Sequence, residues 1–119
     1  MIDQIDKLTQ EKPWGKFEQF AHNQTCTVKI LLVNPGEQLS LQYHHHRDEF
    51  WRVISGTAEI VLGDEILSAR AGDEFFIPRG TKHRIQTKDS ATEILEISFG
   101  EFDEEDIVRL EDKYNRQTK

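Results

Sequence analysis

Turn-forming residues divide most of this chain into short segments, and this division limits the folds that it can adopt. Strong turn sequences occur at residues 34–36 (Asn-Pro-Gly), 63–64 (Gly-Asp) and 78–80 (Pro-Arg-Gly). With the single glycines between them, they recur roughly every 8 to 12 residues. Within the segments apolar and polar residues alternate, as in residues 26–32, which is the period of a half-buried strand. The pattern predicts an all-β sandwich or barrel.

The period changes near the C-terminus. Asp103 is a suitable N-cap, and the acidic residues after it suit the positive end of a helix dipole. Apolar residues then recur at helical spacing from Ile107 to Tyr114. We therefore expect a short C-terminal helix over about residues 103–116, packed on the barrel.

Composition limits the classes of protein to which the chain can belong. Its 119 residues, 36% of them hydrophobic, suit a single domain over residues 1–119, with a barrel over about residues 14–100. Much of the net charge of −7 comes from residues 101–112, which hold seven acids and one arginine, so no basic stripe favours nucleic acid. No apolar run is long enough for a membrane span, and no signal peptide is evident. With Cys26 as the single cysteine, we expect a cytoplasmic protein without disulfides.

Side chains that can bind a metal gather within residues 36–56. Gln42 and His44 lie two residues apart on a predicted strand, so their side chains point to the same side, whereas His45 points to the other. Glu49 begins the next predicted strand, where it can face the same pocket. A run of histidines by itself is about as often solvated surface as a metal site. The prediction of a metal site therefore depends on all the candidate ligands taken together.

His83 follows the rigid turn at residues 78–80 and would complete the set if its strand pairs with the first. Two imidazole nitrogens, one carboxylate and one amide oxygen would leave open positions on a divalent metal. The set fits Zn²⁺, Mn²⁺, Fe²⁺, Co²⁺ or Ni²⁺, and Zn²⁺ is our first choice. The predicted metal ligands are thus Gln42, His44, Glu49 and His83.

The spacing of these residues resembles the two motifs of the cupin superfamily. Residues 36–56 fit the first motif, with Gln42 in place of its first histidine. Residues 72–83 fit the second, and Thr87 stands where an asparagine is usual. The resemblance implies a small double-stranded β-helix, the cupin jelly-roll barrel.

Roughly residues 13–116 further resemble the phosphomannose isomerase domain of type II, a family in which glutamine is the first metal ligand. The matching stretches are PWGKFE, PGEQLSLQYHHHRDEFWRVISGTA, IPRGTKHRI and GEFDEEDIVRLEDKYNR. The sequence departs from the family at Phe50, where histidine is usual, and at Asn115, where glycine is usual. In most such proteins a nucleotidyltransferase domain that makes GDP-mannose precedes this one. The resemblance therefore implies a separate mannose-1-phosphate guanylyltransferase as a partner.

The resemblance also implies an activity, the metal-dependent interconversion of mannose 6-phosphate and fructose 6-phosphate by an aldose–ketose isomerase. Arg109, in the family-like C-terminal segment, would have a catalytic role by closing over the sugar. The phosphate would need cations beside the metal, and the candidates are Arg47, Arg79, Lys82 and Arg84. The alternatives are a metal-binding cupin of another activity, such as a dioxygenase or epimerase-like enzyme, and a non-catalytic sugar-binding module. Because β-rich surfaces leave strand edges to cover, we expect a homodimer.

Overall fold

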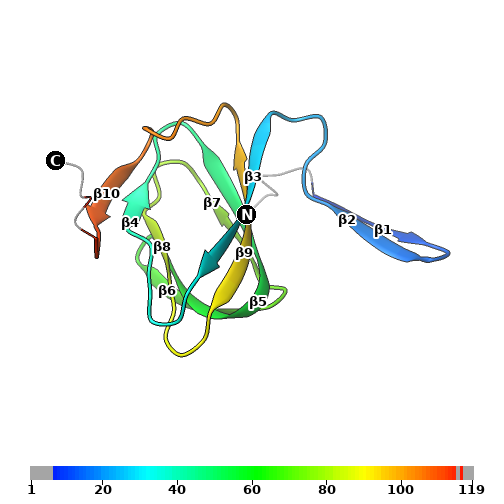
Figure 1. The fold of residues 1–119 in the computed structure, drawn as a ribbon. Helices are drawn as coiled ribbons and strands as arrows, with labels where there is room; N and C mark the ends of the chain where they lie inside the picture. The colour runs from blue at the N-terminus through cyan, green and yellow to red at the C-terminus, as the bar shows by residue number, and fades with distance from the viewer. Residues whose placement is uncertain (1–6, 115, 117–119) are drawn as a thin grey trace.

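A computed structural model describes residues 7–114 and residue 116 of the chain. Within these residues the chain forms ten β-strands and no α-helix, which confirms the all-β prediction (Figure 1). No helix capable of crossing a membrane occurs in this part of the chain. The strands are β1 (Leu8–Lys12), β2 (Gly15–Gln19), β3 (Cys26–Val33), β4 (Leu41–Tyr43), β5 (Asp48–Leu62), β6 (Glu65–Arg70), β7 (Glu74–Ile77), β8 (His83–Gln86), β9 (Thr92–Phe99) and β10 (Val108–Glu111).

The long strand β5 joins two antiparallel layers. Its first part pairs with β7 and β9, and β9 pairs in turn with β3. Its second part pairs with β6 and β8, and the sheet continues through β4 to β10. The register with β9 shifts between Val53 and Ser55, and Gly56 follows with a φ of 79°. This irregularity lies where β5 passes from one layer to the other, as bulges at barrel corners do.

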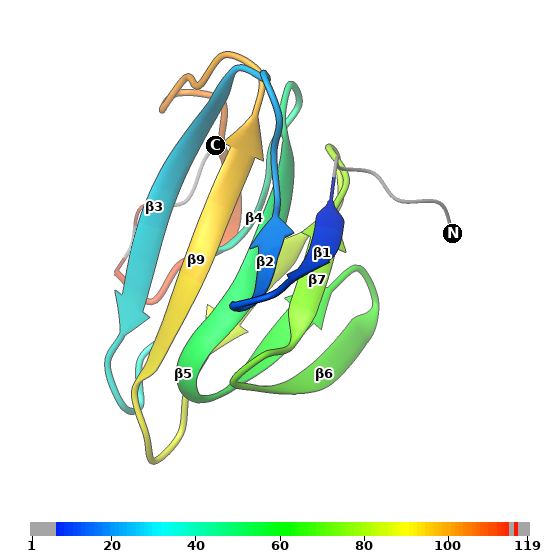
Figure 2. The ribbon, with the colours of Figure 1, turned by 90° about the vertical axis from the view of Figure 1, so that its right-hand side faces the viewer.

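The core lies between the two layers, which face each other in Figures 1 and 2. Trp51 from the first part of β5 and Ile60 from the second are 1% and 0% exposed. Ile94 on β9 and Ile85 on β8 are also fully buried. Because alternate residues of each strand point inward, the arrangement is the expected double-stranded β-helix, and its rigid strands fix the side chains at one end of the barrel.

The C-terminal helix expected over about residues 103–116 is a wrong prediction, although residue 115 lies outside the described residues. Asp103 does cap backbone N–H groups, but it caps a turn. The N–H of Glu105 donates to Asp103 Oδ1 (2.9 Å), and the N–H of Asp106 donates to the Asp103 carbonyl (3.0 Å). Residues 108–111 then continue as β10.

Tertiary pairing explains why a strand replaces the helix. β10 pairs antiparallel with β4, with Val108 opposite Tyr43 and Arg109 opposite Gln42. On its other side β4 pairs with β8, so without β10 it would be a sheet edge with open backbone groups. An isolated helix of about four turns has little intrinsic stability, and the open edge of β4 decides the conformation.

β1 and β2 form a separate two-stranded hairpin that projects from the barrel (Figure 1). Its link to the barrel includes Phe20, whose ring centroid lies 5.3 Å from that of Phe50. Arg52 on β5 forms ion pairs with Glu18 of β2 (3.3 Å) and with Glu74 of β7 (2.5 Å). The barrel itself is formed by the strands from β3 to β10.

Candidate metal centre

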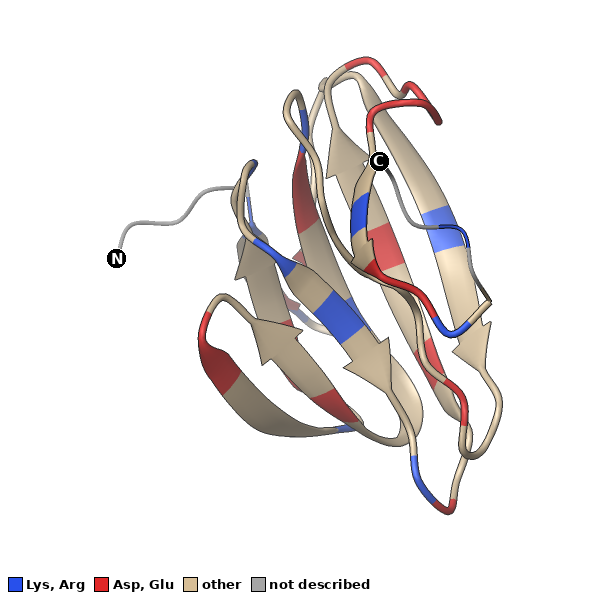
Figure 3. Ribbon diagram, turned by 90° about the vertical axis from the view of Figure 1, so that its left-hand side faces the viewer, with Lys and Arg blue, Asp and Glu red and all other residues tan. Residues whose placement is uncertain are grey.

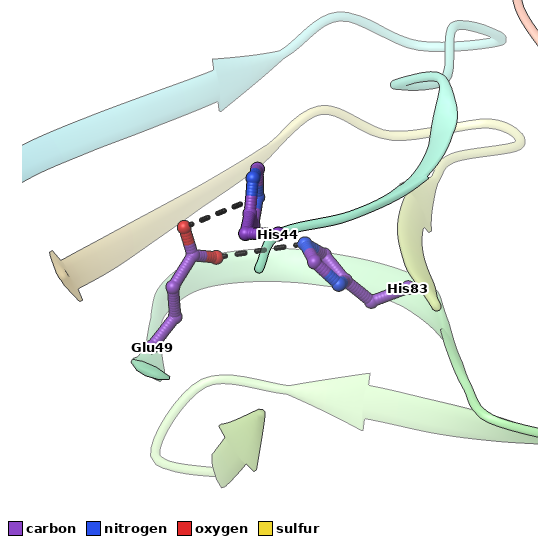
Figure 4. A group of neighbouring side chains, drawn as sticks. All are labelled: His44, Glu49 and His83. Atoms are coloured by element: carbon purple, nitrogen blue, oxygen red, sulfur yellow. Dashed lines mark ion pairs between the residues drawn. The ribbon is translucent and has the colours of Figure 1, made fainter. Parts of the chain in front are cut away.

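Three predicted metal ligands meet inside one end of the barrel (Figure 4). His44 directly follows β4, Glu49 lies on β5 and His83 begins β8. They are 2%, 1% and 1% exposed. His44 Nε2 lies 3.5 Å from Glu49 Oε2, and His83 Nε2 lies 3.6 Å from Glu49 Oε1. Their ligand atoms all lie within 4.8 Å of one another, so the triad could hold one metal ion.

Backbone carbonyls fix the orientation of both imidazoles. His44 Nδ1 lies 2.6 Å from the Asp106 carbonyl oxygen, and His83 Nδ1 lies 2.8 Å from that of Thr81. A carbonyl only accepts hydrogen bonds, so each Nδ1 carries the proton and each Nε2 offers a lone pair to the centre. Metal-binding histidines are commonly held in this way.

Two buried atoms at the centre have no hydrogen-bond partner within the described residues. They are His83 Nε2 and Glu49 Oε1. A neutral imidazole nitrogen and a carboxylate oxygen are both acceptors, so they cannot satisfy each other, and leaving them desolvated costs about 1–3 kcal/mol each or more. A cation between them removes that cost. The donor set therefore fits a divalent metal.

Gln42 stands beside this triad, opposite His83 in the pairing of β4 with β8. Its Nε2 lies 3.4 Å from His44 Nε2, and its Oε1 accepts a hydrogen bond from Ser40 Oγ (2.6 Å). Amide oxygen and nitrogen are interchangeable by a half-turn of the side chain. After that turn Ser40 Oγ accepts from the amide, and Oε1 faces the imidazole nitrogen, as a fourth ligand requires.

Arg47 is the predicted phosphate-binding cation that lies nearest to the ligands. Its Nε donates to Glu49 Oε2 (3.0 Å), and one terminal nitrogen lies 3.3 Å from His44 Nε2. Another terminal nitrogen donates to the Asp103 carbonyl, and the guanidinium lies over the ring of Phe102 at 4.4 Å. Arg47 thus binds one oxygen of the Glu49 carboxylate and leaves the other oxygen, Oε1, available to the centre.

The other predicted cations are dispersed. Arg79 is exposed and pairs with Asp48 (3.4 Å), and Lys82 pairs with exposed Asp64. Arg84 is buried but donates to Glu111 (2.6 Å).

Arg109 instead lines a cavity of about 210 Å³ together with Arg47 and Gln42. This cavity is lined by Lys29, Leu31, Leu39, Ser40, Gln42, Arg47, Glu96, Phe102, Glu104, Ile107, Arg109 and Arg116. A larger cavity of about 530 Å³, between β5, β6 and residues 86–90, contains none of the predicted ligands.

The segment between β9 and β10, rich in acidic residues (Figure 3), contains a residue that the sequence analysis missed. Asp106 accepts hydrogen bonds from the backbone N–H groups of His45 (2.8 Å) and His46 (2.9 Å), while its carbonyl holds His44. Both side chains at positions 45 and 46 are exposed. Asp106 therefore fixes the histidine turn through its backbone, an interaction that neither motif spacing nor strand parity indicates.

Burial controls the protonation of the site. It lowers the pKa of His83 to about 4 and, less strongly, the pKa of His44. Both imidazoles are therefore neutral near pH 7, which metal binding requires. Glu96, also missed from the sequence, is 7% exposed on β9 and accepts a hydrogen bond from Trp51 Nε1 (3.1 Å). Burial, followed by the nearby charge of Glu49, raises the pKa of Glu96 to about 7.

The two pKa shifts predict opposite effects of pH on the metal-free protein. The lowered pKa of His83 makes its contribution to stability complete above pH 6.5 and lost as the pH falls toward 4. The raised pKa of Glu96 makes its contribution complete below pH 4.5 and lost as the pH rises toward 7. Each shift is worth about 3 kcal/mol, so in the wild type the two slopes largely cancel.

Glu96→Gln should remove one slope and expose the other. We expect the unfolding free energy of this variant to fall by about 2 kcal/mol relative to the wild type between pH 6.5 and 4.5. Urea unfolding with a chelator present, at half-unit pH steps, measures the difference. Parallel curves for the two proteins would show that Glu96 titrates normally.

Comparisons with known proteins show the family of this chain. The family whose description is "Mannose-6-phosphate isomerase C-terminal" matches residues 4–112. Xanthan biosynthesis protein XanB of Xanthomonas campestris pv. campestris (strain B100) is 43% identical over 88% of this chain and 23% of its own length. Mannose-1-phosphate guanylyltransferase 2 of Escherichia coli O157:H7 is 37% identical over 89% of the chain and 22% of its own length. The chain thus spans less than a quarter of these relatives.

Solved structures agree on the fold. Oxalate decarboxylase from Bacillus subtilis has a TM-score of 0.66 and 26% identity over 73% of this chain and 24% of its own. Capsular polysaccharide assembling protein CapF from Staphylococcus aureus has a TM-score of 0.63 and 24% identity over 88% of this chain and 32% of its own. A Klebsiella pneumoniae protein with a double-stranded β-helix domain has a TM-score of 0.59 and 24% identity over 66% of this chain and 69% of its own. The predicted cupin fold is confirmed.

The predicted isomerase activity is contradicted by the comparisons. The curated relatives are named as guanylyltransferases and as xanthan and alginate biosynthesis proteins. These names indicate nucleotide-sugar synthesis and contradict the expected aldose–ketose isomerase, which interconverts mannose 6-phosphate and fructose 6-phosphate. The error has a physical origin, because the motifs report a fold and its metal ligands, and one fold with one ligand set supports many reactions.

Proposed function

The chain belongs to the mannose-6-phosphate isomerase C-terminal family, and on that premise we propose that it is a metal-dependent sugar-phosphate-binding cupin that acts in nucleotide-sugar synthesis. The proposed ligands are Gln42, His44, Glu49 and His83, with Zn²⁺ as the preferred ion. The bound metal would supply a Lewis acid that coordinates an oxygen of the sugar. Cations that line the adjoining cavity would bind the phosphate group of the sugar phosphate.

The orphaned acceptor pair of Glu49 and His83 is the observation that carries the metal part of this proposal. Two imidazoles, one carboxylate and one amide oxygen would give Zn²⁺ four protein ligands, and expansion to five-coordination would provide the position for a sugar oxygen. Carbonyl-held imidazoles support the same conclusion, because their orientation is set before any ion arrives.

The adjoining cavity supports a phosphorylated monosaccharide as the ligand. Lys29, Arg47, Arg109 and Arg116 contribute four cations against two carboxylates, Glu96 and Glu104, in its lining. One guanidinium group can donate two parallel hydrogen bonds to the oxygens of a phosphate. Its volume of about 210 Å³ is below the roughly 300–1,000 Å³ typical of pockets for drug-sized ligands. It therefore suits one sugar ring with its phosphate better than a whole nucleotide sugar.

The names of the relatives support a working context. Several are mannose-1-phosphate guanylyltransferases, so we propose a separate enzyme of that kind as a partner and the cytoplasm as the location. We also retain the homodimer predicted from the sequence. In this context Arg109 serves as a phosphate contact at the cavity, in place of the catalytic role first expected.

Calorimetry with defined ligands tests the proposal. Zn²⁺-loaded protein should bind mannose 1-phosphate or mannose 6-phosphate at least about tenfold more tightly than free mannose, a difference of about 1.4 kcal/mol. Chelator-treated protein should lose this preference. Arg109→Ala should weaken binding, whereas Arg79→Ala, outside the cavity, should leave it unchanged. If the loaded protein binds neither sugar phosphate, the proposal fails. Weaker sugar-phosphate binding by Arg79→Ala would instead favour the phosphate-binding cations predicted from the sequence.

A further inference from the structure

Glu96 is a buried carboxylate that the proposed metal centre does not use. It is 7% exposed on β9, and its Oε2 accepts a hydrogen bond from Trp51 Nε1 (3.1 Å). Trp51 is only 1% exposed, so the packing of its indole in the core also fixes the carboxylate. Burial of a carboxyl group is costly unless its oxygens find hydrogen-bond donors. One hydrogen bond leaves part of that cost unmet, and a ligand can meet the rest.

The position of Glu96 along β9 places it between the apolar core and the metal centre. Ile94, Glu96 and Ser98 are alternate residues of the strand, so their side chains share its inward face. Ile94 is fully buried in the core, whereas Ser98 Oγ donates to Glu49 Oε2 (3.3 Å), beside the metal ligands. Glu96 also lines the cavity that contains Gln42. A ligand in that cavity would therefore meet Glu96 close to the metal centre.

The second oxygen of the Glu96 carboxylate, Oε1, is open to this cavity. Within the described residues the side chain forms one hydrogen bond, through Oε2, and no ion pair. Oε1 is not one of the enclosed atoms without a partner, which include Glu49 Oε1 and His83 Nε2. Lys29 lies opposite Glu96 on the neighbouring strand β3 (Figure 2), but it pairs with Glu104 (3.7 Å). Oε1 is thus an oriented acceptor that a ligand in the cavity can reach.

A carboxyl group is out of place in a cavity that binds phosphate alone. The four cations of the lining suit a phosphate dianion, whereas a carboxylate among them repels it. A carboxyl group accepts hydrogen bonds in either protonation state, and the hydroxyl groups of a sugar are donors. The lining therefore combines cations for a phosphate with a fixed acceptor for a hydroxyl group.

We propose, resting on the sugar-phosphate-binding function proposed above, that Glu96 selects a sugar phosphate over other phosphate esters by accepting a hydrogen bond from a hydroxyl group of the sugar. The lining cations bind the phosphate group that all such esters share, and Glu96 Oε1 binds a group that only the sugar supplies. Glu96 is thus a specificity-determining residue and not a metal ligand. The ligand class is a phosphorylated monosaccharide with a free hydroxyl group on its ring.

Calorimetry with two kinds of phosphate ester tests this role on the Zn²⁺-loaded full chain. One kind is mannose 1-phosphate or mannose 6-phosphate, and the other is methyl phosphate, which has the ester but no hydroxyl group of a sugar. The measured quantity is the ratio of the two affinities. Glu96→Ala should weaken sugar-phosphate binding about 10- to 100-fold, the range for a hydrogen bond to a charged group. It should leave the binding of methyl phosphate unchanged or tighter, so the ratio falls.

Glu93→Ala is the matched control. Glu93 is a carboxylate of the same strand, but it lies an odd number of residues from Glu96 and is outside the cavity lining. This variant should keep the wild-type ratio. Glu96→Gln is a milder second variant that keeps the size of the side chain and an acceptor for Trp51. Because its amide nitrogen can only donate toward the cavity, it should lower the ratio about tenfold.

Circular dichroism and zinc content show whether each variant keeps its fold and its metal. Both Glu96 variants should retain the wild-type spectrum and about one Zn²⁺ per chain, because Glu96 is not a ligand. If the wild type binds sugar phosphates and both Glu96 variants keep its ratio, the role of Glu96 is overturned and the proposed function stands. Equal weakening of both kinds of ester would show a structural role and overturn it too. A wild type that binds neither sugar phosphate would overturn both proposals.

Discussion

Replacing His83 by alanine should abolish stoichiometric metal binding, with at least about a 100-fold loss of Zn²⁺ affinity, or about 2.7 kcal/mol. His83 Nε2 faces Glu49 from a buried position, and its Nδ1 is already held by the Thr81 carbonyl. Alanine leaves no ligand there, and a site of two remaining strong ligands binds far more weakly. Elemental analysis of protein without a histidine tag gives the stoichiometry, and titration against a coloured chelator gives the affinity.

Two further variants make the result specific to this geometry. His45→Ala removes an exposed histidine beside His44, and it should bind metal as the wild type does. Asp106→Ala keeps every ligand but removes the carboxylate that holds the histidine turn, so it should lose about 10- to 100-fold, as other supporting residues around metal ligands do. If His83→Ala and His45→Ala retain equal metal, the triad is not the binding site.

Gly56→Ala should be the most destabilising small substitution in the barrel, costing more than about 4 kcal/mol. Gly56 lies at the passage of β5 between the layers with a φ of +79°, and a Cβ there would overlap the backbone carbonyl of Ala91, whose carbon lies 3.0 Å away. Ala91 directly precedes β9, so its backbone cannot move aside without disturbing the pairing of Thr92 with Gly56. Domains of this size are stable by about 5–15 kcal/mol, so the variant should lose a large share of that stability.

Gly80→Ala separates the clash from the backbone strain. Gly80 has a nearly identical φ of +81°, but no other atom lies within 4 Å of the position of its Cβ. Alanine should therefore cost only the left-handed conformation, about 1–2 kcal/mol. Urea unfolding of both metal-free variants beside the wild type measures the two costs. Equal losses would mean that strain alone, and not the approach of β9, requires glycine at position 56.

The metal ligands were predictable because their placement depends on local rules. Strand alternation put Gln42 and His44 on one side and set His45 aside, and the structure agrees, since His44 is buried and His45 is exposed. The interval from the turn at residues 78–80 to His83 is short and rigid. The motif spacing was therefore enough to predict that His83 lies at the site. That a metal occupies the site stays a prediction.

Residues that act through distant contacts escaped this reasoning. Asp106 holds the histidine turn across 60 residues of sequence, and Glu96 reaches Trp51 from another strand. The same limit applies to the predicted phosphate-binding cations. Arg79 and Lys82 adjoin ligands in sequence, but they pair with Asp48 and Asp64 and do not line the cavity, and their role stays a prediction. Proximity along a chain says little about which cations line a pocket formed by several strands.

By itself, the sequence determined the strands from β2 to β9, the turns and the three residues that converge at the centre, because alternation and turn chemistry act within a few residues. The tertiary structure decided the fate of residues 108–111, which pair with the open edge of β4 instead of forming a helix. It also decided the pKa values of His83 and Glu96, which depend on burial by strands far apart in the chain. It also decided that Val28, Ile30 and Leu32, on the outward side of β3, stay 57%, 55% and 61% exposed within the described residues.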